Sequence, residues 1–192
     1  MMKKFLTAAL AVTALLGSGC IFSRNDYVEN TVFDLNLPKQ ARSNAKVRVG
    51  VFKNLSGSER RFVVRRSDGQ VVSLEYQRWR LTPDLLLTRC MYDAFQVSGG
   101  DSDGAPQINA VIYRFEFDEG ENAARLSVDF TLAYPNGKNN AEGTKAQAKN
   151  VTVRADVSVP VKGAEDIAAA RAAAMSECVR LAVEKLAAEM RK

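Results

Sequence analysis

The chain contains no histidine among its 192 residues. This absence excludes Ser-His-Asp and Cys-His catalysis and any zinc site with histidine ligands. The three cysteines, Cys20, Cys90 and Cys178, are too far apart for a metal-binding motif. The sequence also lacks the glycine-rich phosphate-binding motifs and the G-x-S-x-G motif of hydrolases. We therefore predict a protein that is not an enzyme and has no cofactor or metal; an enzyme built on carboxylates alone is the alternative left open.

The balance of charge is only mildly basic, with 27 Lys and Arg residues against 22 Asp and Glu residues. Basic and acidic side chains are mixed along the chain, whereas nucleic-acid-binding surfaces concentrate lysine and arginine. This distribution predicts no nucleic-acid partner. It favours solubility and a weak attraction to anionic lipid headgroups.

The first twenty residues have the layout of an export signal. Lys3 and Lys4 precede an apolar run over residues 5–16, and small residues 17–19 lead into Cys20. A basic start, a short apolar core and a small-residue end are typical of a secretory signal peptide, and the run is too short for a membrane span. The position of Cys20 predicts a lipoprotein signal peptide over residues 1–19 and a lipid anchor on Cys20. The alternative is an ordinary secreted protein cut near Gly17, with Cys20 as a plain thiol.

The rest of the chain divides into a lipidated tether over residues 20–30 and a single domain over residues 31–192. The tether has no hydrophobic periodicity, and the domain is long enough to bury a core. Ile21, in place of aspartate after the cut, predicts sorting to the periplasmic face of the outer membrane if the host follows the enterobacterial rule.

Alternating apolar and polar residues predict strands, and longer periodic segments predict two helices. The strands are expected over residues 32–37, 46–51, 61–66, 70–74, 108–117, 126–134 and 151–159. The helices are expected over residues 82–96 and 164–191. This order indicates an α/β domain with a mixed sheet and flanking helices, which we expect on both faces of the sheet.

Several positions carry more specific predictions. Val47, Val49 and Val51 alternate and should share one buried face, while Asp68-Gly69 signals a hairpin. Thr82-Pro83-Asp84 predicts a helix start with a hydroxyl cap.

Cys90 and Cys178 lie on the apolar stripes of the two predicted helices. An exported protein folds in an oxidising compartment, so a disulfide is one alternative. A disulfide requires Cα atoms within about 7 Å of each other. Helices on opposite faces of a sheet do not meet that condition, so we favour two separate buried thiols.

Several short motifs follow one another along the domain, each occurring once. They are Val32-Phe33-Asp34-Leu35-Asn36-Leu37-Pro38, Val47-Arg48-Val49, Val63-Val64-Arg65-Arg66, Tyr76-Gln77-Arg78-Trp79, and a helix with Arg89 and Ala94-Phe95. In this order the chain resembles the ABC-type transport auxiliary lipoproteins, the PqiC/YmbA-like family that accompanies MCE-domain lipid transporters. It departs from that pattern at residues 55–58 and at Arg80-Leu81-Thr82-Pro83 after the tryptophan.

The resemblance implies a three-layer α/β fold similar to anticodon-binding domains. It also implies a non-catalytic, membrane-anchored accessory that acts by protein–protein contacts, with an MCE-domain periplasmic protein as partner; a homo-oligomer is compatible with this role. The alternative function is another envelope-assembly lipoprotein on a similar fold, either a cell-wall synthase activator or an outer-membrane assembly factor.

The candidate partner-binding residues are Tyr76, Arg78, Trp79, Arg65 and Arg66. Aromatic and arginine side chains dominate protein interfaces. Arg65 and Arg66 form a dense basic segment with Arg60 and Arg61. This segment could face anionic lipid or an acidic partner. The alternatives are that Trp79 packs the helix entry onto the sheet and that the arginines belong to a solvated strand.

Overall fold

The structure, a computed structural model, describes residues 28–37, 43–98, 104–135, 149–163 and 165–192. The predicted signal peptide, Cys20, most of the tether and Pro38 lie outside these residues. The strands are β1 (Thr31–Phe33), β2 (Lys46–Asn54), β3 (Arg61–Arg65), β4 (Val71–Trp79), β5 (Gln96–Val97), β6 (Gln107–Asp118), β7 (Ala123–Ala133) and β8 (Asn150–Pro160). The helices are α2 (Pro83–Ala94) and α3 (Ile167–Glu189).

The strands form one mixed sheet organised around β6. Along one edge β6 pairs antiparallel with β7, which pairs antiparallel with β8. Along its other edge β6 pairs in parallel first with β2 and then, at its end, with β3. The outer strands complete the sheet, with β5 beside β2, β4 beside β3 and β1 beside β4. The predicted α/β class, a mixed sheet with flanking helices, is confirmed.

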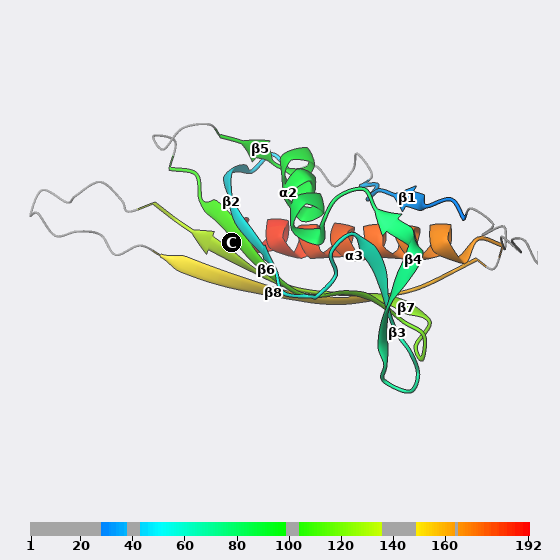
Figure 1. Ribbon diagram of the computed structural model, residues 1–192. Coiled ribbons are helices and arrows are strands. Elements are labelled where there is room, and N and C mark those ends of the chain that lie inside the picture. Colours follow the sequence, from blue (N-terminus) through cyan, green and yellow to red (C-terminus); the bar gives the residue numbers. More distant parts are fainter. Residues whose placement is uncertain (1–27, 38–42, 99–103, 136–148, 164) are drawn as a thin grey trace, which may run out of the picture.

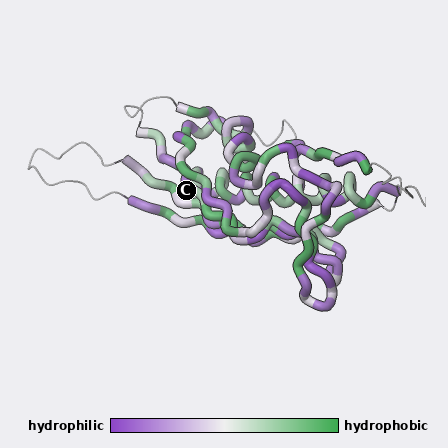
Figure 2. Tube along the Cα trace, in the orientation of Figure 1, coloured by the Kyte–Doolittle hydropathy of each residue, from purple (hydrophilic) through white to green (hydrophobic). Residues whose placement is uncertain are grey.

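Both helices lie on the same face of the long strands (Figure 1). Helix α3 packs along β7 and β8, and α2 packs on β2 and touches α3. Residues of both helices join one hydrophobic core with the inward-facing residues of the sheet. The expectation of helices on both faces was wrong, because the outward-facing residues of β7 and β8 are mainly polar and leave only one apolar face to cover. Figure 2 shows apolar and polar residues alternating along these strands.

The prediction for β2 was right at its start and wrong at its end. Val47 is fully buried and Val49 half-buried, but Val51 is 61% exposed. The pairing of β2 with β6 shifts register between Val49 and Phe52, so Phe52 takes the inward position that alternation assigned to Val51. The amide side chain of Asn109 accepts a hydrogen bond from the backbone N–H of Val51 at 2.9 Å within this irregular segment.

The two helices begin differently. Helix α2 begins at Pro83 after Thr82, but the Thr82 hydroxyl makes no capping hydrogen bond to the described residues, so this detail of the prediction was wrong. Asp84 lies in the first turn, where its charge suits the helix dipole. Helix α3 has a true side-chain cap, since Asp166 accepts hydrogen bonds of 3.0 Å from the N–H groups of Ala168 and Ala169.

The hairpin between β3 and β4 turns at Asp68-Gly69, as predicted. Gly69 adopts a φ of 87°, a left-handed conformation that favours glycine. The N–H of Arg66 donates to the carbonyl of Gln70 at 2.8 Å and closes the turn. Beyond the turn, β4 continues to Trp79, five residues further than the alternation indicated, because β1 pairs with its final residues.

Cys90 and Cys178 are both buried and free, which confirms the preference for separate thiols. Burial raises the pKa of each thiol to about 12. The geometric reason offered for their separation was wrong, since the helices share a face of the sheet. Cys178 instead directs its sulfur to the backbone of β7, 3.3 Å from the carbonyl oxygen of Ala124.

Within the described part of the chain, no helix is both long and apolar enough to cross a membrane.

Candidate functional site

A basic hollow of about 470 Å³ opens where the loop after β2 meets β3 and β4. We call it the basic pocket and define it by its lining residues, Gly57, Glu59, Arg60, Arg61, Ser73 and Arg78. Three arginines and one glutamate give this small surface an excess of positive charge. The pocket includes Arg78 from the predicted partner-binding set and adds Arg60 and Arg61 from the predicted basic segment.

The loop that leads into the pocket is held by short-range hydrogen bonds. The side chain of Asn54 donates to the carbonyl of Ser58 at 2.5 Å and accepts from the hydroxyl of Ser56 at 2.7 Å. Gly57 adopts a φ of 73°, which the tight turn requires. Ser58 is fully buried, and its hydroxyl donates to the carbonyl of Arg61 at 3.2 Å. These bonds fix the backbone from which Arg60 and Arg61 project.

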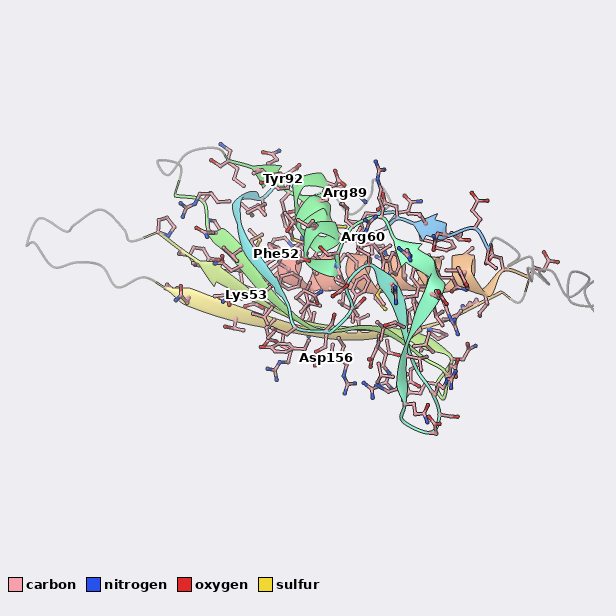
Figure 3. All side chains as sticks on the ribbon, viewed as in Figure 1. Phe52, Lys53, Arg60, Arg89, Tyr92 and Asp156 are labelled. Atoms are coloured by element: carbon pink, nitrogen blue, oxygen red, sulfur yellow. The ribbon has the colours of Figure 1, made fainter. Side chains whose placement is uncertain are left out.

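Arg60 is positioned by main-chain carbonyls. Its Nη2 donates to the carbonyl of Arg80 at 2.8 Å and its Nε to that of Trp79 at 3.4 Å. The N–H of Trp79 donates in return to the carbonyl of Arg60 at 2.6 Å. Figure 3 labels Arg60 close to the end of β4. Because neutral carbonyls hold the guanidinium, its full positive charge remains available to the pocket.

Arg61 and Arg78 face each other directly across β3 and β4. Like charges at opposed positions of neighbouring strands are unfavourable. Among the ion pairs of the described residues, neither arginine finds an acidic partner. An anionic group bound between them would relieve this repulsion and accept hydrogen bonds from both guanidinium groups. The geometry is therefore suited to binding a carboxylate or a phosphate.

Trp79, a predicted partner-binding residue, lies in the core and is fully buried. Its ring centroid lies 4.4 Å from that of Phe62, 5.3 Å from that of Phe115 and 6.4 Å from that of Phe117. Of the two roles predicted for Trp79, contact with a partner is wrong, and packing the entry of α2 onto the sheet is confirmed. A large apolar ring in the middle of an aromatic cluster contributes more there than on a surface.

The other predicted partner-binding residues are scattered. Tyr76 is 42% exposed on β4 and is not part of the pocket lining. Arg66 is exposed at the hairpin. Arg65 donates two hydrogen bonds, of 2.9 and 3.1 Å, to the nearly buried carboxylate of Glu116, which raises the pKa of Arg65. Its charge is therefore neutralised within the chain.

A second ion pair fastens the N-terminal segment next to the pocket. Asp34 accepts two hydrogen bonds from Arg89 of α2, and Arg80 lies 3.7 Å from the same carboxylate. The hydrogen bonds from Arg89 hold the pKa of Asp34 below its ordinary value. Arg89 thus ties the segment after β1 to α2 and is a structural residue.

The helix-free face of the sheet has another hollow of about 470 Å³, lined by Arg114, Arg125, Leu126, Ser127, Asp156, Val157 and Ser158. Arg125 pairs there with Asp118 at 3.3 Å and with Glu121. These ion pairs neutralise Arg125, and Asp156 in the same lining offsets the charge of Arg114. The basic pocket, whose arginines have no such partners among the described residues, is the better candidate for an anionic ligand or an acidic partner surface.

The sequence pointed to half of this site. The sequence analysis identified the run of arginines and Arg78. Alternation within single strands could not predict that Arg61 would lie opposite Arg78. That pairing follows a register shift between Arg61 and Val63. Gly57, Glu59 and Ser73 were not singled out; the polar Ser56-Gly57-Ser58 turn was the available signal for the first of them.

Comparison with known proteins places the fold. No family model matches the chain, and no curated protein matches it. Among solved structures, an uncharacterized protein is similar with a TM-score of 0.56 at 13% identity, covering 85% of this chain and 99% of the other. Protein XCC0632 from Xanthomonas campestris, described as DUF330, is similar with a TM-score of 0.51 at 16% identity, covering 84% of this chain and 98% of the other. At these identities the likeness shows a shared fold, over most of this chain and nearly all of the other two.

Proposed function

We propose that this protein is a non-catalytic, membrane-anchored lipoprotein accessory of an MCE/ABC-type envelope lipid transport system. It acts by contacts with a periplasmic MCE-domain protein. The observation that carries the proposal is the ordered set of motifs from Val32 to Phe95, which resembles the PqiC/YmbA-like auxiliary lipoproteins. The α/β fold agrees in class with the one that this resemblance implies.

The basic pocket supports the contact role. Backbone carbonyls hold the guanidinium of Arg60, and strand pairing fixes the backbone positions of Arg61 and Arg78, so this charge is partly preorganised. Preorganised charge on a rigid sheet favours association with a surface of the opposite sign. We infer that an acidic surface of the partner docks at the basic pocket.

Membrane attachment completes the proposed role. The leader over residues 1–19 and the Ser18-Gly19-Cys20 junction support acylation of Cys20. Ile21 supports localisation at the periplasmic face of the outer membrane. From that position the domain would reach periplasmic partners through the short tether of residues 20–30.

Site-specific photo-crosslinking in cells tests this proposal. A photoreactive amino acid at Ser73, an exposed position in the basic pocket, should capture an MCE-domain protein that mass spectrometry identifies. The matched control carries the same group at Ser67, exposed at the hairpin and outside the pocket lining, and should capture much less. Capture of cell-wall synthases alone would replace the proposal with the envelope-assembly alternative.

A further inference from the structure

Strand β8 forms one edge of the sheet. It pairs with β7 over all 11 of its residues without a register shift, and none of the other described strands pairs with its outer side. Natural edge strands are usually shortened, bulged or guarded by inward-pointing charges, which prevents pairing with other chains. Strand β8 is long and regular, and its proline stands at its last position.

The hydrogen bonds that flank β8 show which of its backbone groups point outward. The N–H of Tyr134 donates to the carbonyl of Lys149, and the N–H of Val161 donates to that of Asn122. Hydrogen-bonded pairs alternate along an antiparallel ladder. The odd-numbered residues 149–161 therefore bond to β7, and the even-numbered residues 150–158 direct their N–H and C=O groups to the free edge.

The sequence of β8 is self-complementary about Ala155. When two copies of the strand run antiparallel with Ala155 opposite Ala155, Arg154 of each copy faces Asp156 of the other. The remaining opposed positions are also matched in kind: Val153 with Val157, Thr152 with Ser158, and Val151 with Val159. In this register the opposed Arg154 and Asp156 are both even-numbered, so their outward backbone groups form hydrogen-bonded pairs as well.

Neighbouring registers are worse. Centring the pair on Arg154 would oppose the two Arg154 side chains, and centring it on Asp156 would oppose the two Asp156 side chains. Like charges directly opposite each other across strands are destabilising, while opposite charges are favourable. Of these three alignments, only the one about Ala155 brings together charges of opposite sign.

The side chains at this edge are already placed for such a contact. Asp129 holds Arg154 through bonds of 2.8 and 3.0 Å to Nε and Nη2, and Nη1 has no hydrogen-bond partner among the described residues. The Arg154 side chain is still 69% exposed. Asp156 projects from the helix-free side of the sheet (Figure 3). On the other side, Val151, Val157 and Val159 are only half-buried, and a second copy would cover them.

We propose that β8 is a dimerisation edge at which two copies of this chain pair antiparallel about Ala155 and form one continuous sheet. The contact is isologous, because the same strand serves both copies. Each dimer has two Arg154–Asp156 pairs across the interface. This inference stands apart from the proposed transport role, since the basic pocket is built from the loop after β2, β3 and β4.

Disulfide trapping tests the register of the proposed β8–β8 pairing. The full-length chain is produced in cells, and its disulfide-linked forms are analysed in the isolated membranes. The double variant Thr152→Cys/Ser158→Cys places cysteines opposite each other, where Cα atoms of paired strands fall within the limit of about 7 Å. A disulfide-linked dimer is expected on non-reducing gels. Each single variant is the control and should give little, because its cysteine lies six residues from its own copy in the partner strand, about 20 Å away. Absence of the dimer from the double variant, or equal dimer from the singles, overturns the proposal.

Charge reversal provides a second test in the detergent-solubilised mature protein. Asp156→Arg opposes two arginines at each contact and should weaken self-association by about tenfold or more, measured by sedimentation. Thr131→Arg places an arginine on β7, one strand away from the edge, and should have little effect. Thermal unfolding of both variants checks that the fold is intact. A wild-type protein that stays monomeric, or an Asp156→Arg variant that associates as the wild type does, contradicts the proposal.

Discussion

The rings of Phe62 and Trp79 pack with their centroids 4.4 Å apart and their planes inclined by 35°. Phe62 belongs to β3, and Trp79 ends β4 just before α2 begins. Phe117 of β6 lies against both rings. This contact therefore joins the hairpin, the central strand and the entry of α2.

Truncation of Trp79 should be strongly destabilising. Trp79→Ala is expected to lower the free energy of unfolding by about 3–5 kcal/mol, because it opens a large cavity in the core. Trp79→Phe should cost less, about 1–2 kcal/mol, since Nε1 of the buried indole has no hydrogen-bond partner to lose among the described residues. Tyr76→Ala, on the exposed side, should change stability by about 0.5 kcal/mol or less. Urea unfolding measures all three, and a small effect of Trp79→Ala would contradict the core assignment.

The pair between Asp34 and Arg89 predicts a pH dependence of stability. The pKa of Asp34 is lowered in the folded state, chiefly by the hydrogen bonds from Arg89. Its stabilising contribution is therefore present above the unfolded pKa of about 3.9 and is lost as the pH falls through the folded value. Asp34→Asn should lower the melting temperature at pH 7 and have a smaller effect at pH 3, where the contribution of the carboxylate has begun to fall. An equal loss at both pH values would count against the ion pair; Glu75→Gln, exposed on β4, is the control.

The two buried thiols predict a simple reactivity pattern. Burial raises the pKa of Cys90 and of Cys178 to about 12, so at pH 8 almost no thiolate is present in the folded domain. Both thiols should resist a water-soluble disulfide reagent until denaturant is added and then react together. Their raised pKa values also mean that stability falls as the pH rises above about 8.5, the ordinary value of an unfolded cysteine. Rapid labelling of the folded protein would contradict this burial.

The lipid anchor on Cys20 is testable by metabolic labelling with a clickable fatty acid. The wild-type protein should carry the label and fractionate with membranes. Cys20→Ala should lose the label and accumulate as an uncleaved precursor or a soluble form. Equal labelling of the two proteins would reject lipidation at Cys20, and recovery of the wild type in inner-membrane fractions would reject the outer-membrane assignment.

The sequence predicted most of the long elements, because their apolar periodicity is strong. It misplaced Val51 because a bulge in β2 reverses alternation, and bulges leave little trace in a single sequence. It left Trp79 open between a partner surface and packing at the helix entry, because alternation in β4 does not show that the strand ends inside an aromatic cluster. The basic pocket was only half predicted for a related reason: the opposition of Arg61 and Arg78 depends on strand register, which is a tertiary property.

We propose that the protein works by docking an acidic partner surface at the basic pocket. The double variant Arg61→Gln/Arg78→Gln removes the two opposed charges and leaves a shorter, uncharged polar side chain at each position. Arg66→Gln, an exposed arginine at the hairpin outside the pocket, is the matched control. Because these residues are exposed or half-buried, neither change should alter folding by more than about 0.5 kcal/mol.

The decisive measurement is the yield of the MCE-domain protein crosslinked from position 73 in these two backgrounds. We predict about a tenfold lower yield with Arg61→Gln/Arg78→Gln and an unchanged yield with Arg66→Gln. An undiminished yield from the double variant would contradict docking at the basic pocket. Absence of any MCE-domain protein from the wild-type crosslinks would contradict the proposed function itself.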